Sequence, residues 1–309
     1  MDLREVLDGA ITDFQWWIQH RLSGLRGKLQ RPAKGKAWSQ NLQERILPRE
    51  GGGPVLLAAD SRLSDPLTLR LLHLARGRGS RVMVVAGMDV SFAPPARHIA
   101  RQLNRFGVEK ISALALVTRT DAEDPRRWDG LLESDLVIVA GQDPEQGALL
   151  GSDSSFTTAL QAAYRQGTPI AFLGGAASLA GGWLAARDGE TPAPGWGLLP
   201  SFAIAGAASH GSHFLTWVQS LSRAPRALRW GLWLETGTAA LVGDGMIEPL
   251  GKPGCLLLPL SQFRAAAGTP SEGKAQEFHL LPPGLPWRLG PPGGSTDAPQ
   301  RDDALAAKR

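Results

Sequence analysis

The sequence predicts an α/β fold, in which helices cover both faces of a mostly parallel sheet to give three layers. Three observations support this prediction. Short β-rich apolar runs alternate along the chain with longer segments that have helical spacing. The apolar runs are continuous, which indicates strands buried on both faces and therefore a parallel sheet. After Gly195 the pattern changes to that of a β-hairpin unit closing the domain at its C-terminal side.

The elements follow in order from these patterns. Five strands are expected at Pro54–Ala59, Arg81–Ala86, Ile111–Val117, Asp135–Ala140 and Pro169–Leu173. Four helices are expected between them, near 66–76, 95–106, 126–132 and 156–165. The hairpin unit is expected at Arg229–Leu234, Thr238–Val242 and Met246–Leu250, with a turn at Asp244-Gly245 and a further strand at Gly254–Pro259.

Composition bounds the class of protein. The chain has 309 residues, and its hydrophobic content of 43% is enough for a core of enzyme size, which excludes a disordered chain. A single cysteine, Cys255, permits no internal disulfide and no multi-cysteine metal site. The longest apolar runs fall well short of the roughly 20 residues that cross a bilayer. We therefore expect a cytoplasmic protein.

The chain divides into three parts. Residues 1–50 are expected to form an amphipathic helix and a basic linker, residues 51–262 the α/β domain, and residues 263–309 a Pro/Gly-rich, largely irregular tail. The net charge of +4 is concentrated in the linker, where eight basic residues and one acidic residue lie between positions 21 and 49. This linker lacks regular aromatic spacing and any zinc or recognition-helix pattern, so we expect no specific nucleic-acid binding.

The N-terminal helix carries an apolar stripe. Its members recur at three- and four-residue steps: Leu3, Val6, Leu7, Ala10, Ile11, Phe14, Trp17, Ile18, Leu22 and Leu25. Such a stripe docks on the protein's own body, on a partner protein or on a second copy of this chain. A membrane surface is the competing partner, because Trp16 and Trp17 and the basic residues after the stripe are typical of interfacial helices.

Ligands of parallel sheets bind beyond the carboxyl ends of the strands, and the segments around those ends resemble a known family. They read ARGRGSRVMVVAGMD (75–89), LNRFGVEKISAL (103–114), LLESDLVIVAGQD (131–143), YRQGTPIAFLGGAASLAGG (164–182), GWGLLP (195–200) and WGLWLETGTAALVGDG (230–245). This order resembles the cyanophycinase-like serine peptidases. The resemblance covers about residues 54–258.

The resemblance implies a Rossmann-like sheet of the class I glutamine amidotransferase-like type, a homodimer, and substrates that are aspartyl peptides, including cyanophycin. In the family a nucleophilic serine stands on a sharp strand-to-helix turn reading Gly-Thr-Ser-Ala-Gly-Ala, and a histidine follows later in Asp-Gln-His-Phe. Such a turn presents the hydroxyl to its base and backbone N–H groups to the developing oxyanion. Amidotransferases of this fold need a cysteine at the turn, whereas Cys255 lies in a late strand.

The serine motif is altered in this chain. After Leu173 comes Gly174-Gly175-Ala176-Ala177-Ser178, and alignment of the glycine pair places Ala177 at the serine position. A one-residue slip makes Ser178 the candidate nucleophile, with alanines replacing both flanking glycines. Alternatively, Ser178 is a helix N-cap or first-turn hydroxyl. In either case we expect the Ala177-Ser178 peptide at the start of a helix directly after the strand.

The histidine motif is altered as well. Without a gap, the family's histidine position falls on Ala207; with a gap, His213 becomes the candidate base and His210 a weaker one. Both histidines otherwise fit a partly exposed helix surface. The loop after the fourth strand reads Gly141-Gln142-Asp143-Pro144, so the resemblance implies substrate-binding roles for Gln142, Asp143 and Gly175.

Neither a cofactor nor a metal is expected. The loop Ala58-Ala59-Asp60 after the first strand lacks the glycine-rich turn of dinucleotide sites, and the other histidines are scattered singly. The scaffold glycines are kept while the site motifs are altered. The sequence therefore predicts a cyanophycinase-like protein without catalytic activity that binds or scaffolds a partner. The alternative is an active serine peptidase that cleaves cyanophycin or aspartyl dipeptides through Ser178.

Overall fold

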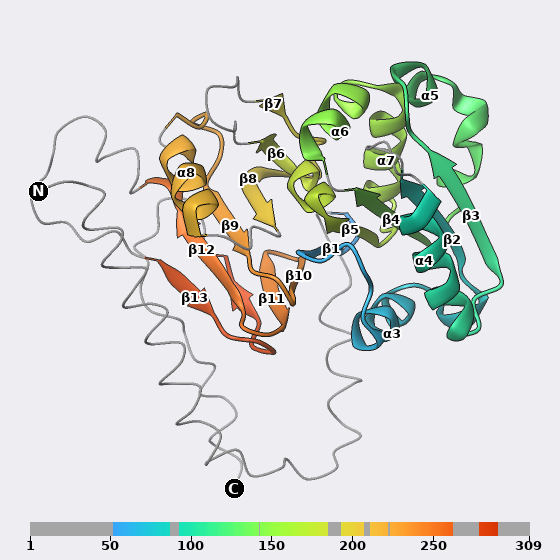
Figure 1. The fold of residues 1–309 in the computed structure, drawn as a ribbon, viewed down its shortest axis with the longest axis horizontal. Coiled ribbons are helices and arrows are strands. Elements are labelled where there is room, and N and C mark those ends of the chain that lie inside the picture. The colour runs from blue at the N-terminus through green and yellow to red at the C-terminus, as the bar shows by residue number, and fades with distance from the viewer. Residues whose placement is uncertain are drawn as a thin grey trace, which may run out of the picture.

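A computed structural model describes residues 52–86, 93–141, 143–184, 193–206, 211–221, 223–261 and 278–289. The expected N-terminal helix and basic linker, residues 1–50, lie outside these ranges. The described residues form two sheets with helices packed on their faces (Figure 1). The α/β class expected from the sequence is confirmed.

The main sheet has eight strands in the order β14-β11-β10-β1-β5-β4-β2-β3. Five of them are parallel and match the expected strands to within about two residues. They are β1 (Val55–Ala58), β2 (Arg81–Ala86), β3 (Lys110–Ala115), β4 (Leu136–Gly141) and β5 (Ile170–Gly174). These strands read as unbroken apolar runs because β1, β4 and β5 are buried along their whole length.

Helices cover both faces of the main sheet. On one face lie α3 (Asp65–Leu74) and α4 (Ala93–Arg105); the other carries α5 (Arg119–Glu123), α6 (Pro144–Gly151) and α7 (Ser155–Arg165). The expected helix over 126–132 is wrong. Two 3₁₀ turns, η2 (Pro125–Arg127) and η3 (Asp129–Leu131), stand there, because the backbone N–H groups of Trp128 and Leu131 bond to carbonyl oxygens three residues back instead of four. A third short turn, η1 (Gly77–Gly79), precedes β2.

Two strands of the expected hairpin unit and the turn between them are confirmed, whereas its first expected strand, Arg229–Leu234, belongs as β9 (Trp230–Leu234) to a second sheet. Strands β10 (Thr238–Gly243) and β11 (Met246–Gly251) pair antiparallel, and β10 extends the main sheet beside β1. The turn residues Asp244 and Gly245 both have positive φ, at 50° and 69°, as a two-residue type I′ turn requires. The main sheet is therefore mixed, with its antiparallel strands at one side.

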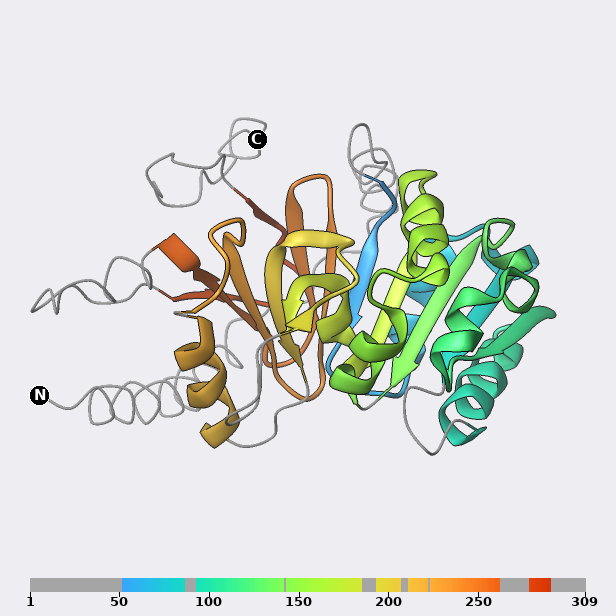
Figure 2. The ribbon, with the colours of Figure 1, turned by 90° about the horizontal axis from the view of Figure 1, so that it is seen from above.

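A second sheet of six strands was not expected. Its order is β13-β12-β9-β8-β6-β7, and helix α8 (Gly211–Leu221) covers its outer face. Figure 2 shows it beside the main sheet. Its strands are β6 (Gly181–Leu184), β7 (Ala193–Pro194), β8 (Leu199–Gly206), β9 (Trp230–Leu234), β12 (Cys255–Pro259) and β13 (His279–Leu281). Glycines and prolines in β6, β7 and β8 hide the strand pattern from sequence reasoning.

The two sheets share one core. Leu57 of β1, Phe172 of β5, Ile204 of β8 and Leu232 of β9 belong to a single buried cluster. Burying such a side chain contributes about 1.5–3 kcal/mol. This packing fixes the carboxyl ends of β1 and β5 against the second sheet.

The C-terminal part differs from the expected irregular tail. Within residues 263–309, the segment 278–289 returns to the fold: β13 pairs with β12 in the second sheet, and β14 (Trp287–Arg288) pairs with β11 in the main sheet. Strands of three and two residues between prolines carry too little pattern to be read from sequence.

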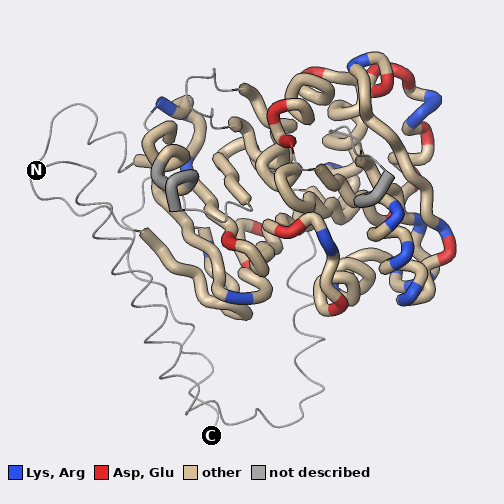
Figure 3. Tube along the Cα trace, in the orientation of Figure 1, with Lys and Arg blue, Asp and Glu red and all other residues tan. Residues whose placement is uncertain are grey.

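Charged residues are unevenly spread over the described chain. They lie mainly on the helices and loops around the main sheet, whereas the strands of the second sheet are largely uncharged (Figure 3). Among the described helices, none is both long and apolar enough to cross a membrane.

Candidate functional site

The carboxyl ends of β1, β5 and β8 meet at one point. A Cβ added to Gly206 at the end of β8 would lie 3.6 Å from the Ala177 Cβ and 3.7 Å from both the Ala59 Cα and the Gly174 carbonyl oxygen. Ligand sites of parallel sheets form outside these strand ends. We therefore take this convergence as the candidate site.

A sharp turn connects β5 to the 3₁₀ segment η4 (Gly175–Ala180). The turn residue is Gly174, with φ 69° and ψ −140°. Residues other than glycine rarely adopt this backbone conformation, which costs them about 1–3 kcal/mol. In hydrolases with a nucleophile on a strand-to-helix turn, the nucleophile occupies such a strained position directly after the strand. In this chain the residue with this backbone conformation is Gly174, at the end of β5.

A side chain at this turn would be crowded. A Cβ on Gly174 would lie 3.0 Å from the Gly141 carbonyl oxygen and 3.2 Å from the Ser61 Cβ. Gly141 ends the neighbouring strand β4, and Ser61 belongs to the loop after β1. A side chain on residue 174 would therefore need these two residues to shift by a few tenths of an ångström.

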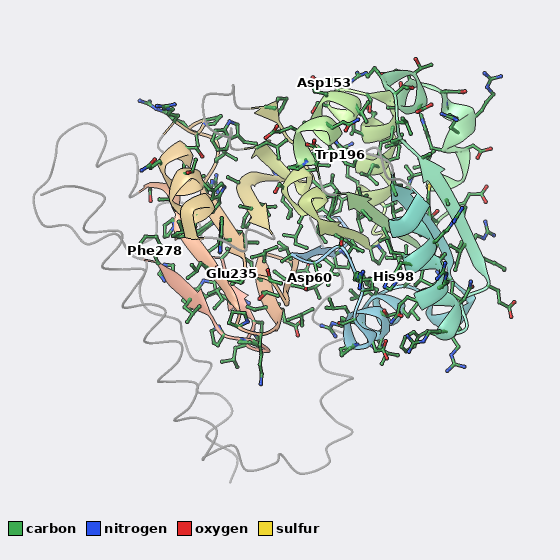
Figure 4. The ribbon with its side chains drawn as sticks, viewed as in Figure 1. Asp60, His98, Asp153, Trp196, Glu235 and Phe278 are labelled. Carbon is green, nitrogen blue, oxygen red and sulfur yellow. The ribbon has the colours of Figure 1, made fainter. Side chains whose placement is uncertain are left out.

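Asp60 ties the turn to the rest of the site. Its carbonyl oxygen accepts a hydrogen bond from Gly174 N at 3.1 Å, and its Oδ2 accepts one from Gly237 N at 2.9 Å. Figure 4 shows Asp60 near the middle of the molecule, between Glu235 on the side of the second sheet and His98 on α4. Glu235 accepts a hydrogen bond from Trp233 Nε1 at 2.7 Å. Both carboxylates thus have a fixed structural partner.

The loop Gly195-Trp196-Gly197 holds segment η4 in place through backbone hydrogen bonds. Trp196 N donates to the Leu179 carbonyl oxygen at 2.7 Å, and Gly197 N donates to that of Gly181 at 3.0 Å. The Trp196 ring is buried against Phe156 and Phe172, edge to face. The position of η4 is therefore set by the core and not by the surface.

The structure places Ser178 in the middle of η4. It is the fourth of six residues, so the expected order of strand, turn and helical segment is confirmed, whereas a position at the helix start, as N-cap or first-turn residue, is wrong. The N-cap position belongs to Gly174. The Ser178 residue is 8% exposed, and its hydroxyl has no hydrogen-bond partner among the described residues.

The remaining candidate residues are only partly described. Gln142 and His210 lie outside the described residues, and His213 is described only as a backbone position in the first turn of α8. Asp143 is the N-cap of α6, where its Oδ1 accepts from Glu145 N at 3.0 Å and Gln146 N at 3.1 Å. Gly175 is the first residue of η4.

Sequence reasoning missed Gly174 and Ser61. The available signal was the end of the strand: a nucleophile turn directly follows its strand, so counting from Leu173 places the critical position at Gly174. Alignment of the glycine pair predicted Ala177, or Ser178 after a one-residue slip, at the nucleophile position instead. Ser61 had no signal, because its contact with Gly174 joins segments far apart in the chain.

The described residues offer no metal site, since no three or more His, Cys, Asp or Glu side chains among them are grouped to hold an ion. Cys255, in β12, is buried, and burial raises the pKa of its thiol to about 12. It is thus a packed thiol and not an activated one.

Comparisons with known proteins give the fold. No protein-family model matches this chain, and no curated protein matches it. It is similar to the structure of a peptidase from an acI-B1 Actinobacterium, with TM-score 0.59 and 13% identity over 77% of this chain and 97% of that one. It is also similar to the structure of a putative peptidase E protein from Listeria monocytogenes EGD-e, with TM-score 0.50 and 9% identity over 66% of this chain and 100% of that one.

These similarities and the geometry define the class. The chain is an α/β protein with the peptidase fold of these two structures. Within that fold, its strand-to-helix turn after β5 carries glycine.

Proposed function

We propose that this chain is a cyanophycinase-like, peptidase-fold protein without serine-peptidase activity that acts as a binding or scaffolding protein. The observation that carries the proposal is Gly174 at the strained turn after β5. A serine nucleophile, its base and an oxyanion site act together, so loss of the nucleophile alone removes most of the rate enhancement.

Packing around the turn supports the proposal. A Cβ added at this glycine would crowd Gly141 and Ser61, so the backbone around the turn is adapted to a residue without a side chain. The hydrogen bonds of Trp196 and Asp60 hold the framework around it. A site that keeps its scaffold and lacks its nucleophile is suited to binding.

Labelling with a fluorophosphonate probe tests the proposal directly. We expect no labelling of the full-length protein and no hydrolysis of cyanophycin or β-aspartyl-arginine. Labelling that is lost in Ser178→Ala would overturn the proposal. Labelling that persists in Ser178→Ala but is lost in Ser61→Ala would overturn it as well, by locating the nucleophile at the loop after β1.

The alternative function is a serine peptidase that uses Ser178. The hydroxyl of Ser178, one turn beyond Gly174, has no hydrogen-bond partner within the described part of the chain, and this favours the alternative. Under this alternative, His213 or His210 acts as base, and Asp143, Gln142 and Gly175 contact the substrate. Turnover of β-aspartyl-arginine that falls to background in both Ser178→Ala and His213→Ala would establish it.

The proposed partner site includes the N-terminal helix. Its stripe from Leu3 to Leu25 contains Phe14, Trp17 and Ile18, and burial of three such side chains is worth several kcal/mol at about 1.5–3 each. We expect deletion of residues 1–50 to change the size of the protein on gel filtration, or its partners, while the α/β domain stays folded. Unfolding of the truncated protein would assign the helix to the core, and a loss confined to liposome binding would assign it to a membrane.

A further inference from the structure

A cavity of about 340 Å³ lies between helix α3 and the β10–β11 hairpin. Its apolar walls are Pro66 and Leu67 of α3 and Leu250 of β11, and its polar wall is the pair Arg70 and Glu248. A volume of this size and a mainly apolar lining with few polar groups are typical of small-ligand sites. The cavity lies on the face of the main sheet covered by α3 and α4, separate from the buried face that η4 packs against.

The polar pair in the cavity is fixed and mostly buried. Arg70 Nη2 donates to Glu248 Oε2 at 2.6 Å, with the two side chains 20% and 16% exposed. Among the described residues, neither side chain makes another hydrogen bond. Arg70 Nε is buried without a hydrogen-bond partner. Nη1 of Arg70 and Oε1 of Glu248 have no hydrogen-bond partner among the described residues, so the pair offers one donor beside one acceptor.

The charges of this pair select against ions. Arg70 and Glu248 neutralise each other, so an anion that approaches Arg70 meets the Glu248 carboxylate, and a cation that approaches Glu248 meets the guanidinium. A neutral group with an acceptor next to a donor satisfies both partners at once. The amide group has this arrangement, with a C=O that accepts and an N–H that donates.

We propose that the cavity binds an aliphatic amide. Its carbonyl oxygen accepts from Arg70 and its N–H donates to Glu248, while its side chain covers Pro66, Leu67 and Leu250. The inference names a ligand class for the binding role proposed above and rests on that role. The cavity also connects to the candidate site, because Gly237 lines it and donates to Asp60, whose carbonyl oxygen holds Gly174 N.

Titration of the ¹⁵N-labelled full-length protein with N-acetyl-L-leucinamide tests the inference. We expect saturable amide shifts in the millimolar range of dissociation constants. N-acetyl-L-leucine, which carries a carboxylate in place of the terminal carboxamide, is expected to bind about tenfold more weakly, because Glu248 repels the carboxylate and the terminal N–H donors are gone. Absence of saturable shifts, or tighter binding of the acid, would overturn the inference.

Two variants locate the site. The double substitution Arg70→Met with Glu248→Leu removes both polar partners, which keeps buried charge from being left unpaired, and is expected to weaken binding about tenfold. Leu67→Trp fills the cavity and is expected to do the same if the double variant fails to fold. Leu69→Ala is the matched control, since Leu69 lies on the same helix but is 56% exposed and does not line the cavity. Unchanged affinity in a folded double variant, or in folded Leu67→Trp, would overturn the inference.

The outcomes separate this inference from the proposed function. Amide binding together with fluorophosphonate labelling would overturn the absence of peptidase activity and leave the cavity ligand in place. If neither amide binding nor fluorophosphonate labelling is observed, only the inference about the cavity ligand is overturned, and the proposed absence of peptidase activity stands.

Discussion

Replacing Gly174 by alanine tests the turn on which the proposed function depends. The added Cβ takes a φ of 69° that suits only glycine, which costs about 1–3 kcal/mol of backbone strain. It also lies 3.0 Å from the Gly141 carbonyl oxygen and 3.2 Å from the Ser61 Cβ, and such overpacking costs about 1–3 kcal/mol. We expect a loss of about 3 kcal/mol in the free energy of unfolding, or a fall of about 9 °C in Tm.

Gly77→Ala is the matched control for this substitution. Gly77 has nearly the same φ, 74°, but a Cβ there meets nothing within 4 Å, so the control measures strain without contact. We expect it to cost about 1 kcal/mol. Differential scanning calorimetry of the wild type and both variants measures the difference.

Two results would refute the reasoning about the turn. Equal Tm values for Gly174→Ala and Gly77→Ala would show that Gly141 and Ser61 do not restrict it. Fluorophosphonate labelling of Gly174→Ser, with the same Tm as the wild type, would show that a nucleophile fits there and that the site needs only one substitution to regain it.

Three further predictions concern residues outside the turn. Trp196→Ala empties a buried position and removes the indole N–H that donates to the Gly147 carbonyl oxygen at 3.2 Å. We expect it to lower the free energy of unfolding by about 3–5 kcal/mol in chemical denaturation. A loss below about 1 kcal/mol would contradict the packing described for η4. Cys255 is expected to resist Ellman's reagent at pH 8 in the folded protein and to react fully once unfolded. Because burial raises the pKa of this thiol from its ordinary 9.0 to about 12, its contribution to stability is present below pH 9 and is lost as the pH rises toward 12; rapid labelling of the native protein would contradict this. Asp121→Ala removes the acceptor for Val117 N at 2.9 Å and Thr118 N at 2.8 Å, so a fall of about 2 kcal/mol is expected in thermal unfolding, and Asp121→Asn should recover part of it.

The sequence was most informative where burial is uniform. Strands such as Arg81–Ala86 were predicted with their correct bounds because nearly every side chain is buried and therefore apolar. The second sheet was missed because its assignment depends on pairing between distant segments, such as Phe202 with Trp230, and not on the run of residues in any one strand. Local pattern does not contain that information.

The candidate site shows the same limit. Two adjacent glycines, Gly174 and Gly175, permit the turn at either residue, so the sequence leaves its position open. The structure fixes it at Gly174 through the hydrogen bond to Asp60 and the contact with Ser61, both from the loop after β1. Ser178 stood out in sequence because it is a serine near a glycine pair, whereas its distance from the turn appears only in three dimensions.

The path of the chain between the two sheets has a consequence for how the protein breaks down. After β9 in the second sheet the chain supplies β10 and β11 to the main sheet, returns for β12 and β13, and ends the described fold with β14 in the main sheet. No single peptide bond between β9 and β14 can be cleaved to release one sheet as an independent piece. A protease that nicks the chain between β9 and β13 leaves two interleaved fragments, each holding strands of both sheets, and these fragments should stay associated until the whole domain melts.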